Sequence, residues 1–278
     1  TWVPTSQLRV RGIYSEGLGG MSFDESVRLE PSQMGGFNQA FRTVISESLS
    51  GSIEAPEFTT YGLSMEGALP GRTWWGLSWN VIEQDVERTI GAFTGYDAGV
   101  FLATPAYFAD GTPQVLDYEE QSLTATINKL VGDQCAVGAM YRVTRSKLQQ
   151  TLPDLAGAPL DPGQLDISNL EDEATLHEIS LFADWNSPTG VFAHAEANWY
   201  SQDLDDDPNR AALGTTGRSG DEFIHLNALM GYRFNDNSAE VSAGVLNIFD
   251  TDYELSPLNP YLDLPRERSF VLRCRWNF

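Results

Sequence analysis

The sequence has little of the chemistry that usually marks a catalytic or metal site. Only two cysteines, Cys135 and Cys274, and three histidines occur among its 278 residues. Two cysteines cannot form a disulfide framework or a CxxC metal site. His177, His194 and His225 show no HxxxH or HExxH spacing, and no GxSxG, P-loop or GxGxxG motif occurs. We therefore predict that the chain is not an enzyme, with no catalytic residue, metal ligand or cofactor.

Basic residues are also scarce. The chain has 17 Lys plus Arg against 39 Asp plus Glu, which gives a net charge of −22. Binding to a nucleic-acid backbone requires basic side chains that neutralise phosphates. An anionic membrane surface likewise attracts basic segments rather than acidic ones. We therefore expect no nucleic acid among the partners of this protein.

Long hydrophobic runs are missing as well. Apolar residues make up 41% of the chain, and no run of 18 or more occurs, which excludes a transmembrane helix. A membrane β-barrel is not excluded, because its strands are only half apolar. The chain opens Thr-Trp-Val-Pro, without an initiator Met or a signal-peptide pattern. We therefore expect a mature product or part of a longer protein.

Period-two alternation runs through the whole sequence. At the C-terminus one face would carry Phe270, Leu272, Cys274, Trp276 and Phe278, and the other Ser269, Val271, Arg273, Arg275 and Asn277. Such separation is typical of a β-strand. Similar patterns occur at 8–14, 60–66, 75–84, 122–128, 137–144, 191–202 and 224–234, and weaker ones at 174–186 and 238–249. The sequence therefore predicts about ten antiparallel strands.

Short and long connections alternate between these segments. Turn-forming Gly, Pro, Asn or Asp residues predict tight turns at 69–72, 131–133, 186–189 and 235–238. Long polar connections are predicted at 15–54, 88–116, 148–172, 203–219 and 250–265. Placing every long loop at one end is typical of an outer-membrane barrel. We therefore predict an all-β, antiparallel transmembrane β-barrel domain over residues 1–278.

Aromatic residues support this interpretation by gathering at two levels. Beside the predicted tight turns are Trp74, Trp75, Trp185, Tyr232, Phe234, Trp276 and Phe278. Near the opposite rim are Tyr14, Tyr118, Trp199, Tyr200, Phe223, Phe249 and Phe270. Two such bands are typical of the interfacial girdles of membrane barrels.

The predicted polar face would line the interior of the barrel. It carries Arg9, Arg11, Glu66, Arg142, Glu196, Arg233, Arg273 and Arg275. So many charged side chains predict a wet or polar-filled lumen. As candidates for contact with a small-molecule solute we select Arg142, Glu196, Asn198, Arg233, Arg273 and Arg275.

The last 40 residues resemble the end of a TonB-dependent outer-membrane receptor. The segment Asn247-Ile248-Phe249-Asp250-Thr251-Asp252-Tyr253 is similar to the family's Asn-Leu-Phe-Asp-x-x-Tyr motif, and Pro265-Arg266 and a terminal Phe follow. The resemblance implies the C-terminal part of a 22-stranded barrel, in contact with outer-membrane lipid, that actively imports a siderophore, cobalamin, sugar or metal complex. It further implies coupling to the TonB complex through an N-terminal region and plug that this chain lacks. The alternating residues from Phe270 to Phe278 resemble the signal that the barrel insertion machinery reads.

Several alternatives remain open at this point. Leu29-Glu30-Pro31 resembles the family's Leu-x-Pro-Glu segment, but Ser32-Gln33 departs from it, as in barrels fused behind tetratricopeptide repeats. A small complete channel and a soluble carbohydrate-binding β-sandwich also match the alternation. The carboxylates between Asp203 and Asp207 could ligate Ca²⁺, although a solvated acidic loop is the simpler interpretation.

Overall fold

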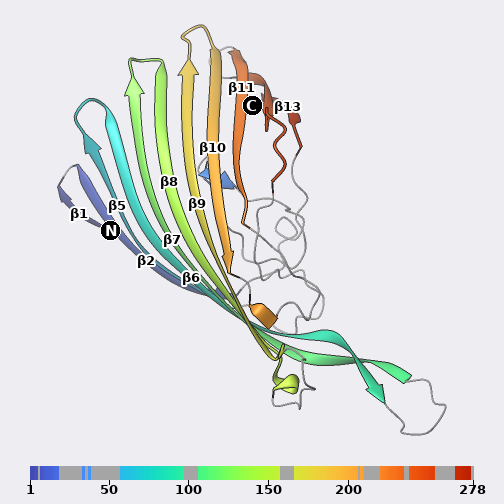
Figure 1. Ribbon diagram of the computed structural model, residues 1–278. Helices are drawn as coiled ribbons and strands as arrows, with labels where there is room; N and C mark the ends of the chain where they lie inside the picture. Colours follow the sequence, from blue (N-terminus) through green and yellow to red (C-terminus); the bar gives the residue numbers. More distant parts are fainter. Residues whose placement is uncertain are drawn as a thin grey trace.

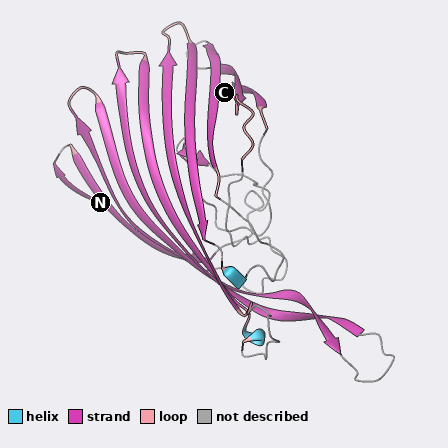
Figure 2. Ribbon diagram, in the orientation of Figure 1, coloured by secondary structure: helices cyan, strands magenta, loops and turns pink. Residues whose placement is uncertain are grey.

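The structure is a computed structural model. It describes residues 1–5, 7–18, 33–34, 37–38, 57–96, 106–156, 166–205, 207–209, 220–234, 238–253 and 267–276. The described chain is nearly all β-strand (Figure 1 and Figure 2). The strands are β1 (Trp2–Thr5), β2 (Leu8–Leu18), β3 (Gln33–Met34), β4 (Phe37–Asn38), β5 (Glu57–Leu69), β6 (Thr73–Tyr96), β7 (Ala106–Val131), β8 (Cys135–Thr151), β9 (Asn169–Asn186), β10 (Val191–Asp205), β11 (Glu222–Phe234), β12 (Ala239–Leu246) and β13 (Ser269–Trp276). One 3₁₀ turn, η1 (Pro153–Leu155), follows β8.

Eleven strands form one curved sheet. Their order is β1-β2-β5-β6-β7-β8-β9-β10-β11-β12-β13, and β3 and β4 form a separate pair. Each neighbouring pair is antiparallel. The predicted all-β antiparallel fold is therefore confirmed. In the described part of the chain the sheet is open, with β1 and β13 at its two edges (Figure 1).

The tight turns lie together at one end of the sheet, the upper end in Figure 1. Strand β5 ends at Leu69 before β6 begins at Thr73, and equally short turns join β7 to β8 and β9 to β10. Gly71 and Gly132 have φ of 82° and 65°, a backbone region that favours glycine. The predicted turns at 69–72, 131–133 and 186–189 are thus confirmed, whereas residues 235–237 of the fourth lie outside the described residues.

The strand boundaries differ from the predicted ones in two places. Residues 2–5, which none of the predicted strands included, form β1, so the sheet has eleven strands where about ten were predicted. Most of the predicted loop at 88–116 belongs to β6 and β7, which pair as far as Tyr96 and Ala106. From Val86 to Tyr96 on β6 and from Ala106 to Gln114 on β7, the two strands pair only with each other among the described residues. A two-stranded ribbon has no face that must pack on a sheet core, so its sequence needs no alternation.

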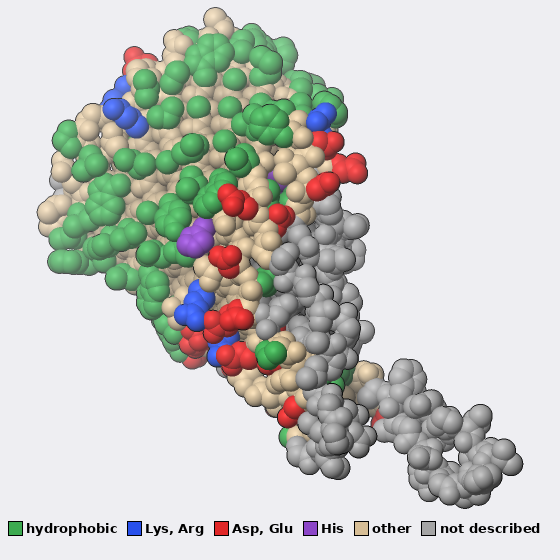
Figure 3. Space-filling model, viewed as in Figure 1, with side chains coloured by type: hydrophobic (Ala, Val, Ile, Leu, Met, Phe, Trp, Pro, Cys, Tyr) green, Lys and Arg blue, Asp and Glu red, His purple; other side chains and the backbone are tan. Residues whose placement is uncertain are grey.

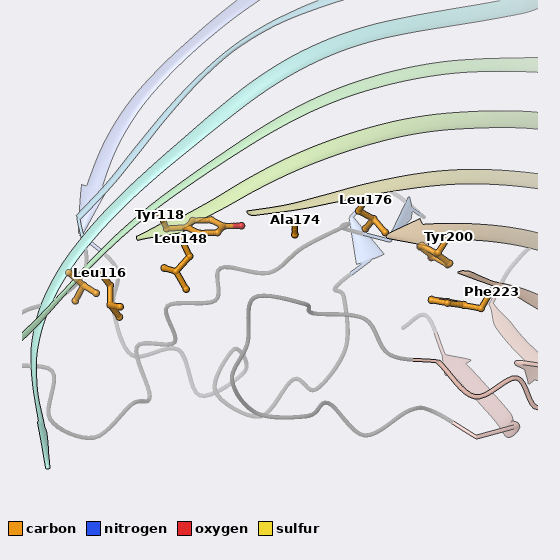
Figure 4. Packing of buried hydrophobic residues seen from close by; sticks show 8 residues of the cluster. Leu116, Tyr118, Leu148, Ala174, Leu176, Tyr200 and Phe223 are labelled. Carbon is orange, nitrogen blue, oxygen red and sulfur yellow. The ribbon is translucent and has the colours of Figure 1, made fainter. Parts of the chain in front are cut away.

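The two ends of the sheet bury different faces. A hydrophobic cluster lies on the concave inner face of the long-loop half, where Leu176 is fully enclosed. Its members point to the same side of the sheet (Figure 4). They are Val86, Leu116, Tyr118, Leu148, Ala174, Leu176, Tyr200 and Phe223. In the tight-turn half most apolar side chains lie on the convex outer face instead, and many of them are exposed, although Met140 and Phe192 are buried on the inner face.

Candidate functional site

The outer face of the tight-turn half is an exposed apolar surface, which we call the apolar band. Strand register places Leu77, Ala125, Tyr141 and Ile179 side by side on this face. Leu181 and Ile127, also in the band, are 52% and 48% exposed. Figure 3 shows these hydrophobic side chains as a broad area near the tight turns. No second sheet or helix covers the band among the described residues.

The apolar band ends abruptly toward the long loops. On the outer face of β6, Val81 is followed two residues later by Glu83. On β8 the same change occurs from Val143 to Arg145. Glu119, Lys147 and Glu173 form one cross-strand row beyond the band. On six more strands the outer face also changes to polar or charged residues toward the long loops. The last apolar or aromatic residues before these changes are Tyr14, Tyr61, Leu123, Ile179, Trp199 and Ile224.

Aromatic side chains at this boundary point their polar atoms away from the apolar band. Tyr14 donates its hydroxyl hydrogen to Glu16, and Tyr61 donates to Glu83 across the sheet at 2.8 Å. The indole N–H of Trp199 donates to Glu222 at 3.1 Å. Each ring therefore lies against apolar neighbours while its polar atom reaches the charged rows, as expected for amphipathic rings at an interface. Tyr14 and Trp199 thus lie at the rim where the sequence analysis places them, on the outer face.

Three of the aromatics predicted for this rim lie elsewhere. Tyr118, Tyr200 and Phe223 are on the inner face and are 2–5% exposed, in the hydrophobic cluster. The rings of Tyr200 and Phe223 stack 4.9 Å apart, and Phe223 also stacks on Tyr253, after β12, at 4.8 Å. The prediction failed because distance from a turn gives the level of a residue but not the face on which it lies.

The inner face of the tight-turn half is polar, as the alternation predicted. Register places all six candidate solute contacts on this face. They form two groups rather than one site. Arg142, Glu196 and Asn198 lie midway along β8 and β10, whereas Arg233, Arg273 and Arg275 lie nearer the tight turns.

Arg142 is part of a cross-strand network. Its side chain faces Glu178 on β9, with Nη1 3.7 Å from Oε2, and its Nε donates to Thr124 Oγ1 on β7 at 3.2 Å. Glu178 has no exposed side-chain surface, and it accepts a hydrogen bond from Ser180 at 3.3 Å. The sequence did not identify Glu178, because β9 was one of the weaker strand patterns. Glu178 is two residues from both Leu176 and Ser180, so alternation along the strand places all three side chains on one face. This spacing was the available signal in the sequence.

Glu196 and Asn198 form a second network on β10. Asn198 donates from Nδ2 to Glu196 Oε1 at 2.9 Å. His194, on the same face, lies 2.8 Å from Asp184 through Nδ1 and 3.9 Å from Glu196 through Nε2. In both networks a basic side chain on one strand therefore faces a carboxylate on the neighbouring strand: Arg142 faces Glu178, and His194 faces Asp184.

The three remaining arginines lie near the tight turns, and one of them, Arg233, contacts the carboxylate of Glu240. Arg233 donates to Glu240 at 3.0 Å and to Asn186 at 2.6 Å, and its guanidinium stacks 4.0 Å from the Phe192 ring centroid. Arg275 is the direct cross-strand partner of Glu240, while Arg273 is paired in register with Ser242. The guanidinium of Arg233 is thus held by structural contacts on three sides.

The residues of the predicted insertion signal lie on the outer face of β13. Phe270, Leu272 and Trp276 are 80%, 74% and 68% exposed. Cys274 falls between them and is exposed too. Phe278 lies outside the described residues, as do Pro265 and Arg266.

The segment that resembles the receptor motif forms a compact bend after β12. Asn247 has a φ of 49°, accepts a hydrogen bond from Thr251 N at 3.0 Å and donates to Thr251 O at 2.9 Å. Asp250 accepts a hydrogen bond from Arg268 N at 2.6 Å, just before β13. The motif residues therefore connect the last two strands. The other resembling segment, from Leu29 to Ser32, lies outside the described residues.

The remaining chemical candidates are dispersed. His177 lies on the outer face, 2.8 Å from the Tyr141 hydroxyl, whereas His194 and His225 lie on the inner face. No group of three or more metal-ligating side chains occurs in the part of the chain that the structure describes. Asp203 and Asp205 belong to β10 rather than to a loop, and Asp206 lies outside the described residues. The carboxylate of Asp207 accepts backbone hydrogen bonds from Glu171 and Asn209.

Comparison with known proteins adds no identification. No protein-family model matches the chain, and no curated protein matches it. Within the described residues, no helix has the length and hydropathy needed to cross a membrane. The resemblance to TonB-dependent receptors therefore depends on the motifs in the sequence alone.

Proposed function

We propose that this chain is part of the wall of an outer-membrane β-barrel of the TonB-dependent receptor type, which takes part in the uptake of a scarce solute. The apolar band on the outer face is the observation that supports this most directly. It changes to charged or polar residues at a similar level on eight strands. A bilayer imposes such a boundary, because its hydrocarbon region has a fixed thickness.

The height of the band fits this proposal. On β8 its outer residues run from Cys135 to Val143, which is 143 − 135 = 8 residue steps. At about 3.4 Å a step this is about 27 Å along the strand. A strand tilted by about 40° would then cover about 21 Å along the membrane normal, close to the roughly 25 Å apolar zone of outer-membrane barrels.

The direction of the edge strands supports a partial barrel over a small complete one. Ten antiparallel steps separate β1 from β13, so both strands run in the same direction. Joining them directly would need a parallel pair. Closure by antiparallel pairs alone requires an odd number of further strands, and a membrane sheet must close because unpaired backbone groups are costly in hydrocarbon. Eleven additional strands would make the 22 that the family resemblance implies.

The inner face is suited to a polar lumen rather than to the core of a sandwich. Arg142, Glu178, Glu196 and Asn198 share it. A soluble sandwich would bury its apolar face under a second layer, and the described residues contain no such layer over the apolar band. By family resemblance, energy for uptake would come from the TonB complex through the N-terminal region of the receptor.

Charge insertion on opposite faces of one strand tests the proposal. Ala125 lies within the apolar band on β7, and its neighbour Thr126 lies on the inner face. Ala125→Arg should lower the amount of folded, heat-modifiable protein in the outer-membrane fraction, because an arginine near the bilayer midplane costs about 2–4 kcal/mol. Thr126→Arg, facing a polar lumen, should leave it nearly unchanged.

The reverse result would contradict the proposal. In a water-soluble protein the exposed Ala125 position tolerates arginine. Normal yield of the Ala125→Arg variant in the soluble fraction without detergent would therefore exclude a membrane-facing band.

A further inference from the structure

Several enclosed side-chain atoms on the inner face make no hydrogen bond to a described residue. Among them, Oε2 of Glu178 and Oδ1 of Asn198 lie on neighbouring strands. Glu178 is fully buried and Asn198 is 1% exposed. The orientation of the Asn198 amide is fixed, because its Nδ2 donates to Glu196. A buried acceptor without a donor is costly, and a carboxylate more so.

The two residues are close enough to share one ligand. Asn198 is the direct partner of Ser180 on β9, so Glu178 is its diagonal neighbour on the same face. Diagonal residues in an antiparallel pair have Cα atoms about 7–8 Å apart, with the side chains closer. The register therefore places the two side chains on the same face of adjacent strands, within the span of one small bridging group.

The charges around this position favour a cation. Glu178 and Glu196 flank Asn198, and Asp184 lies beside His194 on the same face. The cationic side chain that faces Glu178 is Arg142, whose Nη1 is 3.7 Å away, longer than a hydrogen bond. Three carboxyl groups thus lie here with two basic side chains, Arg142 and His194, in a chain whose net charge of −22 would attract positively charged solutes.

An aromatic cluster adjoins the two acceptors on the side of the long loops. Tyr200 is the cross-strand partner of Glu178, and His225 is the partner of Asn198. Tyr253 covers the cluster, with its ring 4.8 Å from Phe223 and 4.4 Å from His225. Aromatic faces next to carboxylates attract organic cations.

We propose that Glu178 and Asn198 form a subsite for a primary ammonium group of the transported solute. The group must be compact, because both acceptor atoms are enclosed. It must donate hydrogen bonds, because both atoms are acceptors, and a positive charge matches the carboxylate. An ammonium group is compact, donates hydrogen bonds and is positively charged. An ionised carboxylate or phosphate is negatively charged and accepts hydrogen bonds instead. This inference rests on the proposed uptake function and adds a substrate class to it.

The test is a titration of the purified protein, with its full native chain, in detergent and 150 mM NaCl. The probes are 1,4-diaminobutane, 1,4-butanediol and succinate, which share a four-carbon chain and differ in charge. Calorimetry should detect binding of the diamine alone. Glu178→Gln should weaken it at least ten-fold, and Asn198→Asp, which adds a carboxylate, should strengthen it about three-fold or more.

Glu173→Gln is the matched control. Glu173 is on the same strand but on the outer face, where it pairs with Arg145 at 2.5 Å. The Glu173→Gln substitution removes the same charge outside the subsite. Non-specific attraction of the diamine to an acidic protein would therefore weaken equally in the Glu173→Gln and Glu178→Gln variants. Heat-modifiable gel mobility verifies that each variant is folded.

Equal binding of the diamine and the diol, or no binding to folded protein, would overturn the subsite and leave ordered water as the partner of both acceptors. A response of Glu173→Gln equal to that of Glu178→Gln would also overturn it. These failures are separable from failure of the uptake proposal. A water-soluble monomer that binds the diamine through Glu178 would contradict the barrel and keep the subsite, and a detergent-dependent barrel without binding would do the opposite.

Discussion

Leu176 and Leu181 lie five residues apart on β9, yet they occupy opposite environments. Leu176, in the long-loop half, lies on the inner face and has no exposed surface. Leu181, in the tight-turn half, lies on the outer face and is 52% exposed. The same residue type thus serves as protein core at one end of a strand and as external surface at the other.

This difference shows that polarity inverts along the sheet. In the tight-turn half most apolar side chains face outward and most polar ones inward. In the long-loop half the hydrophobic cluster is inside, and Glu83, Lys147 and Glu173 are outside. The proposed barrel would produce such an inversion, because lipid would surround only one half of the sheet.

Truncating each leucine should have the largest effect and separate the two environments. Leu176→Ala should lower the free energy of unfolding by about 2–5 kcal/mol, since it leaves a cavity in a buried cluster. Leu181→Ala should cost less than about 1 kcal/mol in detergent, because surrounding apolar chains fill the space. Denaturant unfolding followed by tryptophan fluorescence measures both. Equal losses would show that Leu181 is also in a protein core.

Arginine substitutions sharpen the comparison on the outer face alone. Leu181→Arg should reduce stability in a bilayer by about 2–4 kcal/mol. Thr175→Arg, on the same strand and face but beyond the apolar band, should cost less than about 0.5 kcal/mol because it lies among charged side chains. Urea unfolding of protein reconstituted in lipid vesicles measures the difference. Similar stabilities for the two variants would contradict a boundary between Leu181 and Thr175.

The inversion itself was not predicted, but the two faces of the tight-turn half could be read from the sequence where one face of a strand had to differ from the other. The alternation around Phe270, Leu272 and Trp276 predicted both β13 and its outward face. The tight turns were predicted from residues such as Gly71 and Gly132, whose backbone needs glycine. Local rules sufficed because each feature depends on neighbours a few residues away.

Features that depend on distant strands were not predictable. The contact of Arg142 with Glu178 requires the register of β8 against β9, and 36 residues separate the two. Tyr200 and Phe223 were assigned to an outer rim, although they form part of the inner cluster. The ribbon formed by β6 and β7 was missed, because a strand pair without a buried face has no alternation to detect.

The outer face of the long-loop half should respond to pH. Burial, a hydrogen bond with Asp117 and the negative charge of Asp117 raise the pKa of Asp85 above its usual value. A raised pKa in the folded state means that this carboxyl contributes stability at low pH, and the contribution is lost as the pH rises through the folded-state pKa. The effect should stay below about 1 kcal/mol, since the site is largely solvated.

Thermal unfolding between pH 4 and pH 8 measures this contribution. Asp85→Asn should be more stable relative to the wild type at pH 8 than at pH 4. Asp117→Asn, which removes the second carboxylate, should give the same trend. A difference between wild type and Asp85→Asn that does not vary with pH would contradict the assignment.

The smallest effect is expected at the ion pair between Lys147 and Glu171. Its atoms are 2.8 Å apart, and the side chains are 41% and 46% exposed. A hydrogen bond with Glu171 raises the pKa of Lys147, so the Lys147 ammonium stays charged throughout the physiological range. A double-mutant cycle with Lys147→Gln and Glu171→Gln should give a coupling below about 1 kcal/mol. It should vanish in 1 M salt, where charges are screened beyond about 3 Å. If the coupling persisted there, this surface would be shielded from water, and the charged rows could not mark the point where the sheet leaves the membrane.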